Sequence, residues 1–262
     1  MNDFNFKKKF GQNFLKGDNV VSKIVSCADI PQNTLVIEVG PGAGVLTKKL
    51  ASVANNVLCY EIDTDLEDTL ICNLHEFKNV DIIFDDFLKR DISKDVELYN
   101  YDHIFFVSNV PYYITTPILM HLMDSKIVID KIVMMVQKEV GDRFSALPGK
   151  RDYSSISVFL NYYFDIKKLF FVSKNEFIPK PNVDSIVVSF VRKNELMYLK
   201  DKDQFFKLVR DSFKYKRKTL KNNLKGYPLD KISHVLKKYN YDLSVRAEAL
   251  DVNIFVDISN NL

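Results

Sequence analysis

The strongest constraint on the fold is an apolar run that passes directly into a glycine-rich loop, Leu35–Gly44. An apolar run of this length is typical of a strand in a parallel sheet, where both faces are buried. The loop leads into an amphipathic helical pattern, Val45–Ala54. Glycines let a backbone approach a ligand closely, and the first N–H groups of a helix are free to donate. The segment therefore predicts a strand–loop–helix unit with a ligand at the loop.

The spacing of the glycines narrows the kind of ligand. It is G-x-G-x-G with Pro41 inside, whereas pyrophosphate-binding loops have G-x-G-x-x-G. We therefore expect a nucleoside ligand without a diphosphate.

Acidic residues end the next two predicted strands. Glu61 ends the strand 57–61, roughly 20 residues after the first glycine, where dinucleotide-binding folds place their ribose acceptor. The pair Asp85-Asp86 follows the strand 81–84. One such acid alone is typical of an exposed loop. Three successive strand ends that carry a glycine loop, a glutamate and an aspartate pair, in that order, favour a nucleoside site.

The same alternation of strands and helices continues and predicts an α/β fold. The expected strands are 35–39, 57–61, 81–84, 104–107, 131–137, 166–172 and 186–191, and the expected helices between them include 19–28, 45–54, 138–144 and 155–163. Seven strands with interleaved helices indicate a doubly wound, Rossmann-like sheet. After Arg192 the pattern changes to short helices at 203–213, 219–224, 230–238 and 252–261. We therefore predict two domains, 1–192 and a small helical domain 193–262.

The stretch Asn109-Val110-Pro111-Tyr112-Tyr113 follows the fourth predicted strand and precedes a helix start at Thr115-Thr116-Pro117. Ligands of open α/β sheets bind at the carboxyl ends of the strands. The Asn109 amide oxygen and a carbonyl exposed at the bend can both accept hydrogen bonds from one amino group, and a tyrosine can stack on the ring that carries it. These five residues alone fit a simple turn equally well.

Two segments are strongly basic and contain aromatic residues. Near the start, three lysines lie between Phe6 and Phe10, namely Lys7, Lys8 and Lys9. In the predicted helical domain the basic residues are Lys207, Arg210, Lys214, Lys216, Arg217, Lys218, Lys221 and Lys225, with Asp211 as the acid among them. A solvated terminal tail or helix face explains such runs in many proteins. The scarcity of acids and the presence of Phe213 and Tyr215 favour phosphate contact, as in nucleic-acid binding.

The composition excludes several other classes of function. The chain has 262 residues, of which 47% are hydrophobic and 27% charged, typical of a globular protein. Its three cysteines lack metal-type spacing and its four histidines are scattered, so we expect no metal site. No apolar run approaches the ~20 residues needed to span a bilayer, and no apolar core of a signal peptide follows the first lysines. We expect a cytoplasmic protein that does not bind membranes.

Taken together, these motifs resemble the KsgA-type small-subunit ribosomal RNA adenine N6-dimethyltransferases. The resemblance runs almost end to end, and its blocks are Phe10–Leu15, Glu38–Gly44 with Leu46-Thr47, Glu61, Asp86, Asn109–Pro117, Gln137–Val140 with Arg143, Phe177–Ser185, Arg217–Leu220 and Arg246–Leu250. Each block is weak alone, but together and in order they are specific.

The resemblance implies a role for each matching residue. Gln12, Asn13 and Leu15 would hold the methionine end of S-adenosylmethionine, and Gly40 would line the glycine loop. Glu61 would accept from the ribose hydroxyls, and Asp86 would accept from the adenine amino group of the cofactor. Asn109 would also contact the cofactor.

The same resemblance implies how the target base is held. Asn109 and the Val110 carbonyl would accept from the N6 amine of the target adenine, with Pro111 forming the bend between them and the aromatic wall. Tyr112 and Phe177 would stack on the two faces of that base. The basic residues Lys7–Lys9, Lys214, Lys216, Arg217, Lys218 and Lys221 would contact RNA.

The implied function is dimethylation of two adjacent adenosines in the 3′-terminal hairpin of the small-subunit (16S) ribosomal RNA, by a monomer. Two alternatives stay open. The first is a large-subunit (23S) adenine methyltransferase of the macrolide-resistance type, against which Arg217–Leu220 and Arg246–Glu248 argue. The second is a non-catalytic assembly or transcription factor, against which an intact Asn109 and Tyr112 argue.

Overall fold

The structure is a computed structural model that describes residues 14–262. The described chain divides into two compact units. Unit 1 holds residues 14–141 and Lys167–Val191, and unit 2 holds Asp142–Ile166 and Arg192–Leu262. This division differs from a single boundary at residue 192, because the segment Asp142–Ile166 belongs with the C-terminal helices.

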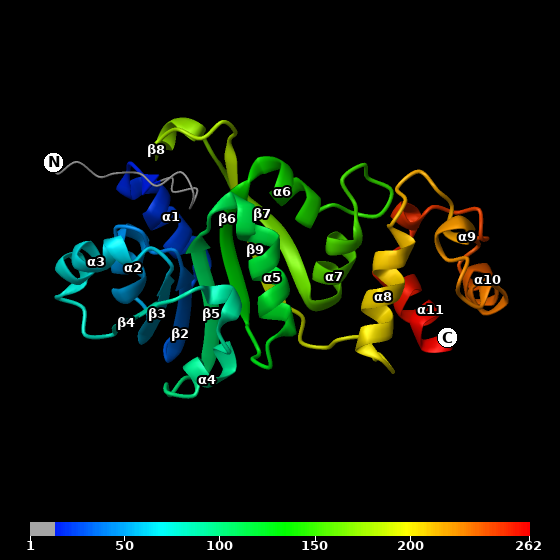
Figure 1. The fold of residues 1–262 in the computed structure, drawn as a ribbon, viewed down its shortest axis with the longest axis horizontal. Coiled ribbons are helices and arrows are strands. Elements are labelled where there is room, and N and C mark those ends of the chain that lie inside the picture. Colours follow the sequence, from blue (N-terminus) through cyan, green and yellow to red (C-terminus); the bar gives the residue numbers. More distant parts are fainter. Residues whose placement is uncertain (1–13) are drawn as a thin grey trace. The chain divides into compact units, whose positions relative to one another are not determined.

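A seven-stranded sheet forms the centre of unit 1 (Figure 1). Its strands, in spatial order, are β4 (Val80–Phe84), β3 (Asn56–Glu61), β2 (Thr34–Val39), β5 (His103–Asn109), β6 (Lys131–Gln137), β9 (Ser185–Arg192) and β7 (Phe164–Val172). The strands from β4 to β6 are parallel, and β9 is antiparallel to β6. The predicted Rossmann-like, seven-stranded α/β fold is confirmed, with an antiparallel strand near one edge.

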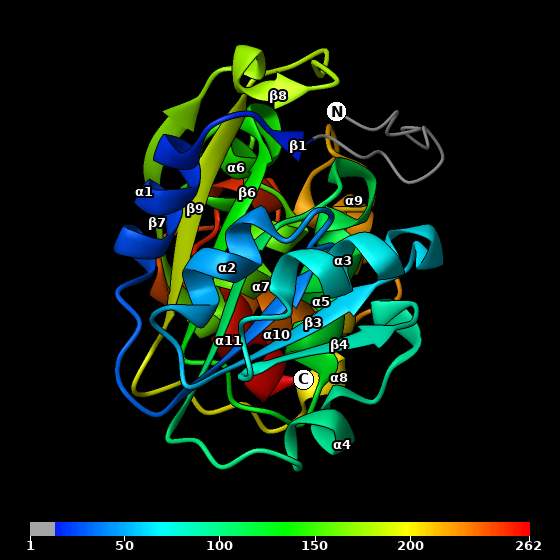
Figure 2. The same ribbon diagram turned by 90° about the vertical axis from the view of Figure 1, so that its left-hand side faces the viewer.

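Helices cover both faces of this sheet, which explains why all six residues of β2 are buried. On one face, Val21 and Ile24 of α1 (Asp18–Ala28) and Leu50 of α2 (Val45–Ala51) pack with Val36 and Val57. Figure 2 shows α1, α2 and α3 (Glu67–Leu74) in front of the strands. Because side chains alternate along a strand, Tyr60 and Phe106 point to the opposite face.

Short elements follow the carboxyl ends of the strands. They are the 3₁₀ turns Thr64–Leu66, Phe87–Lys89 and Tyr112–Ile114, and the helices α4 (Ile92–Val96), α5 (Thr115–Asp124) and α6 (Lys138–Phe144). In α6, Gly141 lies so close to the sheet that an added Cβ would be 2.3 Å from the Ile186 side chain.

A two-stranded antiparallel sheet lies outside the main sheet. It pairs β1 (Phe14–Leu15) with β8 (Phe177–Ile178), so that Leu15 is opposite Phe177. The Lys16 N–H also donates to the Glu176 carbonyl at 2.8 Å. Two segments more than 160 residues apart in the sequence are therefore neighbours.

Unit 2 is helical and consists of α7 (Ser155–Tyr163), α8 (Lys202–Ser212), α9 (Leu220–Asn223), α10 (Leu229–Lys238) and α11 (Val252–Asn261). Its core is aromatic: Phe159 and Tyr162 of α7 pack against Phe205 and Phe206 of α8, with ring centroids 4.5 to 6.3 Å apart. Just before α7, the buried Tyr153 donates to the Leu250 carbonyl at 3.1 Å. These contacts explain why Asp142–Ile166 belongs to unit 2. Within residues 14–262, no helix is long and apolar enough to cross a membrane.

Candidate functional site

A cavity of about 270 Å³ opens in unit 1 where β2, β3, β4 and β5 end. It is lined by the glycine loop, by Glu61, by the pair Asp85-Asp86 and by the stretch Asn109–Tyr113. The position agrees with the rule that open α/β sheets bind ligands outside the carboxyl ends of their strands. Four chain segments that the sequence indicated separately therefore meet at one cavity.

The glycine loop forms one wall of the cavity. Gly40 has φ +72°, a left-handed conformation that side chains rarely adopt, and its N–H donates to the Tyr60 carbonyl at 2.9 Å. A Cβ added at Gly40 would lie 3.7 Å from the Pro111 ring. That distance is an ordinary contact, so the positive φ and not a lack of space favours glycine at this position.

Glu61 is an almost fully buried carboxylate, with 4% of its surface exposed. Its oxygens accept from the Gly42 N–H at 3.3 Å and from the Asp63 N–H at 2.9 Å. Burial raises the pKa of Glu61, and these two backbone donors lower it. The donors hold the carboxylate in place while each oxygen keeps capacity to accept a ligand hydroxyl.

Asp86 begins the turn Phe87–Lys89, and its Oδ1 accepts from the Leu88 N–H at 3.1 Å. Its side chain is 28% exposed, and its Oδ2 lies 3.4 Å from the Lys89 ammonium. Asp85 also lines the cavity, and its Oδ1 accepts from the Asp86 N–H at 2.7 Å. Both members of the acidic pair therefore reach the cavity, and Asp85 additionally holds the backbone of Asp86.

The Asn109–Tyr113 stretch forms the wall opposite the acids. Asn109 ends β5, Val110 is 1% exposed, and Pro111 begins the turn Tyr112–Ile114. The Ile114 N–H donates to the Pro111 carbonyl at 3.2 Å. Asn109, Val110 and Pro111 all line the cavity, so the structure brings these three predicted site residues together.

Of the two aromatic residues predicted to stack on a base, the structure places one at the cavity. Tyr112 lines it, and its hydroxyl is 2.6 Å from the Ser185 hydroxyl at the start of β9. Phe177 is 1% exposed and packs in the hydrophobic core. Its position opposite Leu15 in the β1–β8 pair explains the burial. Among the described residues, Phe177 is not part of the cavity lining, and its stacking role stays a prediction.

The remaining predicted cofactor contacts belong to the N-terminal segment. Leu15 lines the cavity, next to the glycine loop. Gln12 and Asn13 lie outside the described residues, as do Lys7, Lys8 and Lys9.

Glu38 and Tyr113 are among the cavity residues to which the sequence assigned no role. Glu38, inside β2, is 2% exposed, and burial raises its pKa to about 8. A charged residue within a buried strand is the signal that points to it. Tyr113 is 57% exposed and lines the cavity, where the carboxylates of Asp86 and Glu61 add to the effect of burial in raising its pKa.

Part of the predicted basic run lies on a loop between α8 and α9, while Lys207 and Arg210 lie on α8 itself. Lys214, Lys216, Arg217 and Lys218 are exposed on this loop, and Lys221 is exposed on α9. The Asn223 side chain holds this loop by accepting from the Tyr215 N–H at 3.1 Å and donating to the Ser212 carbonyl at 2.7 Å. We call residues 214–218 the basic loop.

A neighbouring segment adds further positive charge to the basic loop. The Lys216 ammonium donates to the Arg151 carbonyl at 3.0 Å, and both Lys150 and Arg151 are exposed. No sequence pattern associates these residues with the loop, because 65 positions separate Arg151 from Lys216. In the part of the chain that the structure describes, no group of three or more potential metal ligands occurs.

Comparison with known sequences identifies a family. The family model for "Ribosomal RNA adenine dimethylase" matches residues 3–262. A protein named ribosomal RNA small subunit methyltransferase A, from Streptococcus gordonii, is 44% identical over 268 residues, covering 99% of this chain and 92% of that protein. The protein of the same name from Streptococcus pyogenes serotype M5 is 43% identical over 269 residues, with the same coverage.

Solved structures agree with the sequence comparison. A dimethyladenosine transferase from Plasmodium falciparum has a TM-score of 0.79 and 25% identity, covering 94% of this chain and 95% of that one. The 23S rRNA methyltransferase ErmE has a TM-score of 0.74 and 23% identity, covering 95% of this chain and 99% of that one. The latter likeness concerns the fold.

Proposed function

This chain belongs to the ribosomal RNA adenine dimethylase family, and from that premise we propose that it transfers methyl groups to N6 of two adjacent adenosines in the 3′-terminal hairpin of the small-subunit ribosomal RNA. It is an S-adenosylmethionine-dependent methyltransferase, as the family implies. The observation that carries the proposal is the cavity, where acceptors suited to a nucleoside and acceptors suited to an aromatic amine meet at adjacent strand ends.

The residues of the cavity fit S-adenosylmethionine, whose sulfonium supplies the methyl group. Gly40 leaves space for the ligand beside the loop, because its backbone conformation excludes a side chain. Glu61 presents a fixed carboxylate for two ribose hydroxyls, and Asp86 presents a carboxylate for the adenine amino group. Leu15 covers the methionine end from the β1–β8 pair.

Asn109 and Val110 prepare the target amine for reaction. An aromatic amine is a poor nucleophile because its lone pair is delocalised into the ring. Two acceptors, the Asn109 amide oxygen and the Val110 carbonyl, hold the amine hydrogens so that the lone pair is directed toward the methyl group. The ammonium formed is strongly acidic, so no general base is required, and catalysis rests on positioning, which can contribute ~7–11 kcal/mol.

Tyr112 supports the target base from one side. Its hydroxyl contact with Ser185 fixes the ring at the cavity, and base–aromatic stacking contributes ~1–3 kcal/mol per base. Such stacking offsets part of the cost of unstacking an adenine from structured RNA. Phe177 would have to leave the core to form a second wall, so the proposal assigns stacking to Tyr112 and a supporting role to Phe177.

The proposed partner is the small ribosomal subunit, bound by a monomer in the cytoplasm. The support is the printed name of the Streptococcus relatives, small subunit methyltransferase A, together with the exposed basic loop of unit 2. The large-subunit alternative has the weaker support, because ErmE is 23% identical while the small-subunit relatives are 43–44% identical. A purely non-catalytic role leaves the pocket acceptors unexplained.

One experiment tests the proposal directly. The protein and labelled S-adenosylmethionine are incubated with unmethylated small subunits and, separately, with large subunits, and methylated adenosines are located by mass spectrometry. We expect dimethyladenosine at two adjacent positions of the small-subunit RNA. Modification of the large subunit alone would support the macrolide-resistance type instead, and absence of methylation on both would contradict the proposal.

A further inference from the structure

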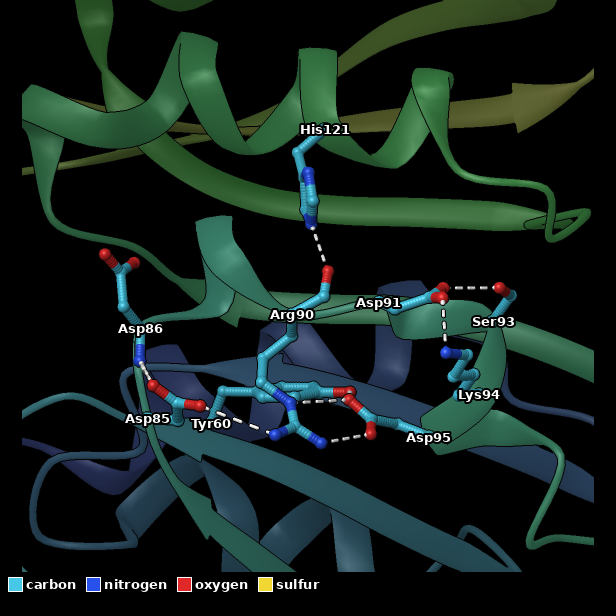
Figure 3. Close-up of polar contacts among 9 residues, drawn as sticks. All are labelled: Tyr60, Asp85, Asp86, Arg90, Asp91, Ser93, Lys94, Asp95 and His121. Atoms are coloured by element: carbon cyan, nitrogen blue, oxygen red, sulfur yellow. Dashed lines mark hydrogen bonds and ion pairs between the residues drawn. The ribbon is translucent and has the colours of Figure 1, made fainter.

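A buried carboxylate, Asp95 of α4, accepts hydrogen bonds from three donor atoms of Tyr60 and Arg90 (Figure 3). Its side chain is 8% exposed. The Tyr60 hydroxyl donates to its Oδ2 at 3.0 Å, and the Arg90 guanidinium donates through Nε at 3.1 Å and Nη2 at 2.5 Å. A guanidinium that binds both oxygens of one carboxylate has a defined orientation, unlike a flexible ammonium.

The same guanidinium also reaches the acidic pair. Arg90 Nη1 lies 3.4 Å from Asp85 Oδ2, and Asp85 Oδ1 accepts from the Asp86 N–H at 2.7 Å. The Arg90 backbone closes the turn that Asp86 begins, because its N–H donates to the Phe87 carbonyl at 3.2 Å. Arg90 thus holds the segment Asp85–Arg90 by its side chain and by its backbone.

The network joins two cofactor-facing strand ends. Tyr60 directly precedes Glu61 in β3, and Arg90 ends the turn that contains Asp86. Asp95 binds both Tyr60 and Arg90. It therefore connects the end of β3, where Glu61 lies, to the turn after β4, where Asp86 lies.

A third element contacts the same turn. His121 of α5, the helix that follows the Asn109–Tyr113 stretch, donates through Nε2–H to the Arg90 carbonyl at 3.0 Å. The buried Phe87 ring lies edge-on to both Tyr60 and His121, with centroids 5.0 and 5.3 Å apart. The turn is therefore held on its apolar side by Phe87 and on its polar side by Arg90.

From this geometry we propose that Arg90 is a positioning residue, which sets the Asp86 carboxylate relative to Glu61 and so determines how strongly the pocket selects a 6-amino purine. The inference rests on the proposed role of Asp86 toward the cofactor adenine. Arg90 touches no ligand in this proposal; it acts through Asp85 and through the backbone of the turn.

The test measures ligand selection and not activity. Isothermal titration calorimetry of the full-length protein gives dissociation constants for S-adenosylhomocysteine and for S-inosylhomocysteine, in which a 6-oxo group replaces the 6-amino group. The oxo group cannot donate to Asp86, so we expect the unmodified protein to prefer the adenosyl ligand about tenfold or more, as for loss of a hydrogen bond to a charged group.

Two variants remove the bidentate contact of the Arg90 guanidinium with Asp95 without leaving a buried unpaired charge. Arg90→Lys keeps a positive charge beside Asp95, and the double variant Arg90→Met/Asp95→Asn removes both charges while leaving an acceptor for the Tyr60 hydroxyl. We expect each to lower the preference at least about threefold. Lys94→Ala is the matched control, because Lys94 forms an exposed ion pair with Asp91 in the same segment and contacts none of the network; its preference should equal that of the unmodified protein.

The outcomes separate this inference from the proposed function. An unchanged preference in both Arg90 variants, or equal weakening of both ligands, overturns the positioning role. Asp86→Ala should abolish the preference, and adding Arg90→Lys to it should change the preference no further. If Asp86→Ala keeps the preference, the proposed role of Asp86 fails and this inference fails with it. If Asp86→Ala abolishes it while the Arg90 variants keep it, only the inference about Arg90 fails.

Discussion

Asn109 and Glu61 show how single residues obtain a role from backbone position. Asn109 is the last residue of β5, and Glu61 is the last residue of β3, so both side chains leave the sheet at its ligand-binding edge. Glu61 is oriented by the backbone donors of Gly42 and Asp63. Asparagine and glutamate are common residue types, and it is the placement of Asn109 and Glu61 at one edge of the sheet that makes them candidates for a site.

The amide of Asn109 gives the most direct prediction at this scale. Replacing it by alanine removes one of the two acceptors that we propose for the target amine. We therefore expect methyl transfer to fall at least ~100-fold, the scale of losing one preorganised polar contact in an active site. Cofactor affinity should change far less, because Glu61, Asp86 and the glycine loop remain. Single-turnover methylation and calorimetric titration of S-adenosylhomocysteine separate the two effects. Transfer at the unmodified rate would remove Asn109 from the mechanism.

Glu38 gives a prediction about pH. Its folded-state pKa of about 8 lies above the ordinary value of 4.5, so the folded protein holds a proton that the unfolded chain releases. The associated stability is fully present below about pH 4.5 and is lost as pH rises through about 8. In Glu38→Gln this contribution does not titrate. We therefore expect the Tm of the unmodified protein, relative to that of Glu38→Gln, to fall by at least about 3 °C between pH 5 and pH 8.5.

The comparison between the two proteins cancels the titration of groups that do not interact with Glu38. A difference in Tm that stays constant over this pH range would show that Glu38 is ionised in the folded protein.

At the scale of elements, most of the proposed ligand contacts come from loops, and the helices and strands hold these loops in position. The basic loop is one example: Asn223 of α9 fixes its backbone, while its charged side chains extend into solvent. A helical pattern would have spread these charges around an axis. The loop instead gathers exposed cations within a few residues, which suits contact with successive phosphates.

The basic loop predicts a change in the salt dependence of RNA binding. Replacing Lys214, Lys216 and Lys218 by alanine should weaken RNA binding and lower the slope of log affinity against log salt by about 2, since each phosphate contact contributes ~0.7–0.9. The matched control replaces Lys231, Lys237 and Lys238 of α10 by alanine. These lysines are also exposed, and their replacement removes the same number of positive charges. Filter binding at several salt concentrations measures both slopes. Equal slopes for the two triple variants would mean that net charge alone matters.

At the scale of the whole chain, the two units differ in what their sequences reveal. Unit 1 has the periodic apolar strands of a parallel sheet, and its fold and glycine loop were predicted from those patterns, including seven strands in nearly the observed ranges. The helices of unit 2 were also expected, but its boundary was not. The aromatic residues of α7 pack on α8, and the order of the elements along the chain does not indicate that these two helices pack together.

The local pattern of residues was sufficient for the strands of the main sheet and for the edge at which we propose the site, because periodicity, glycine spacing and strand-ending acids are properties of neighbouring residues. Long-range packing settled the rest. The pairing of Leu15 with Phe177 turns that ring into the core. Tertiary packing also leaves Glu38 buried at the cavity, places Arg151 beside Lys216, and joins Arg90 to Asp95 and Tyr60. Such contacts depend on which surfaces meet when the chain folds, and the free energy that selects them comes from burial and charge pairing between residues far apart in the sequence.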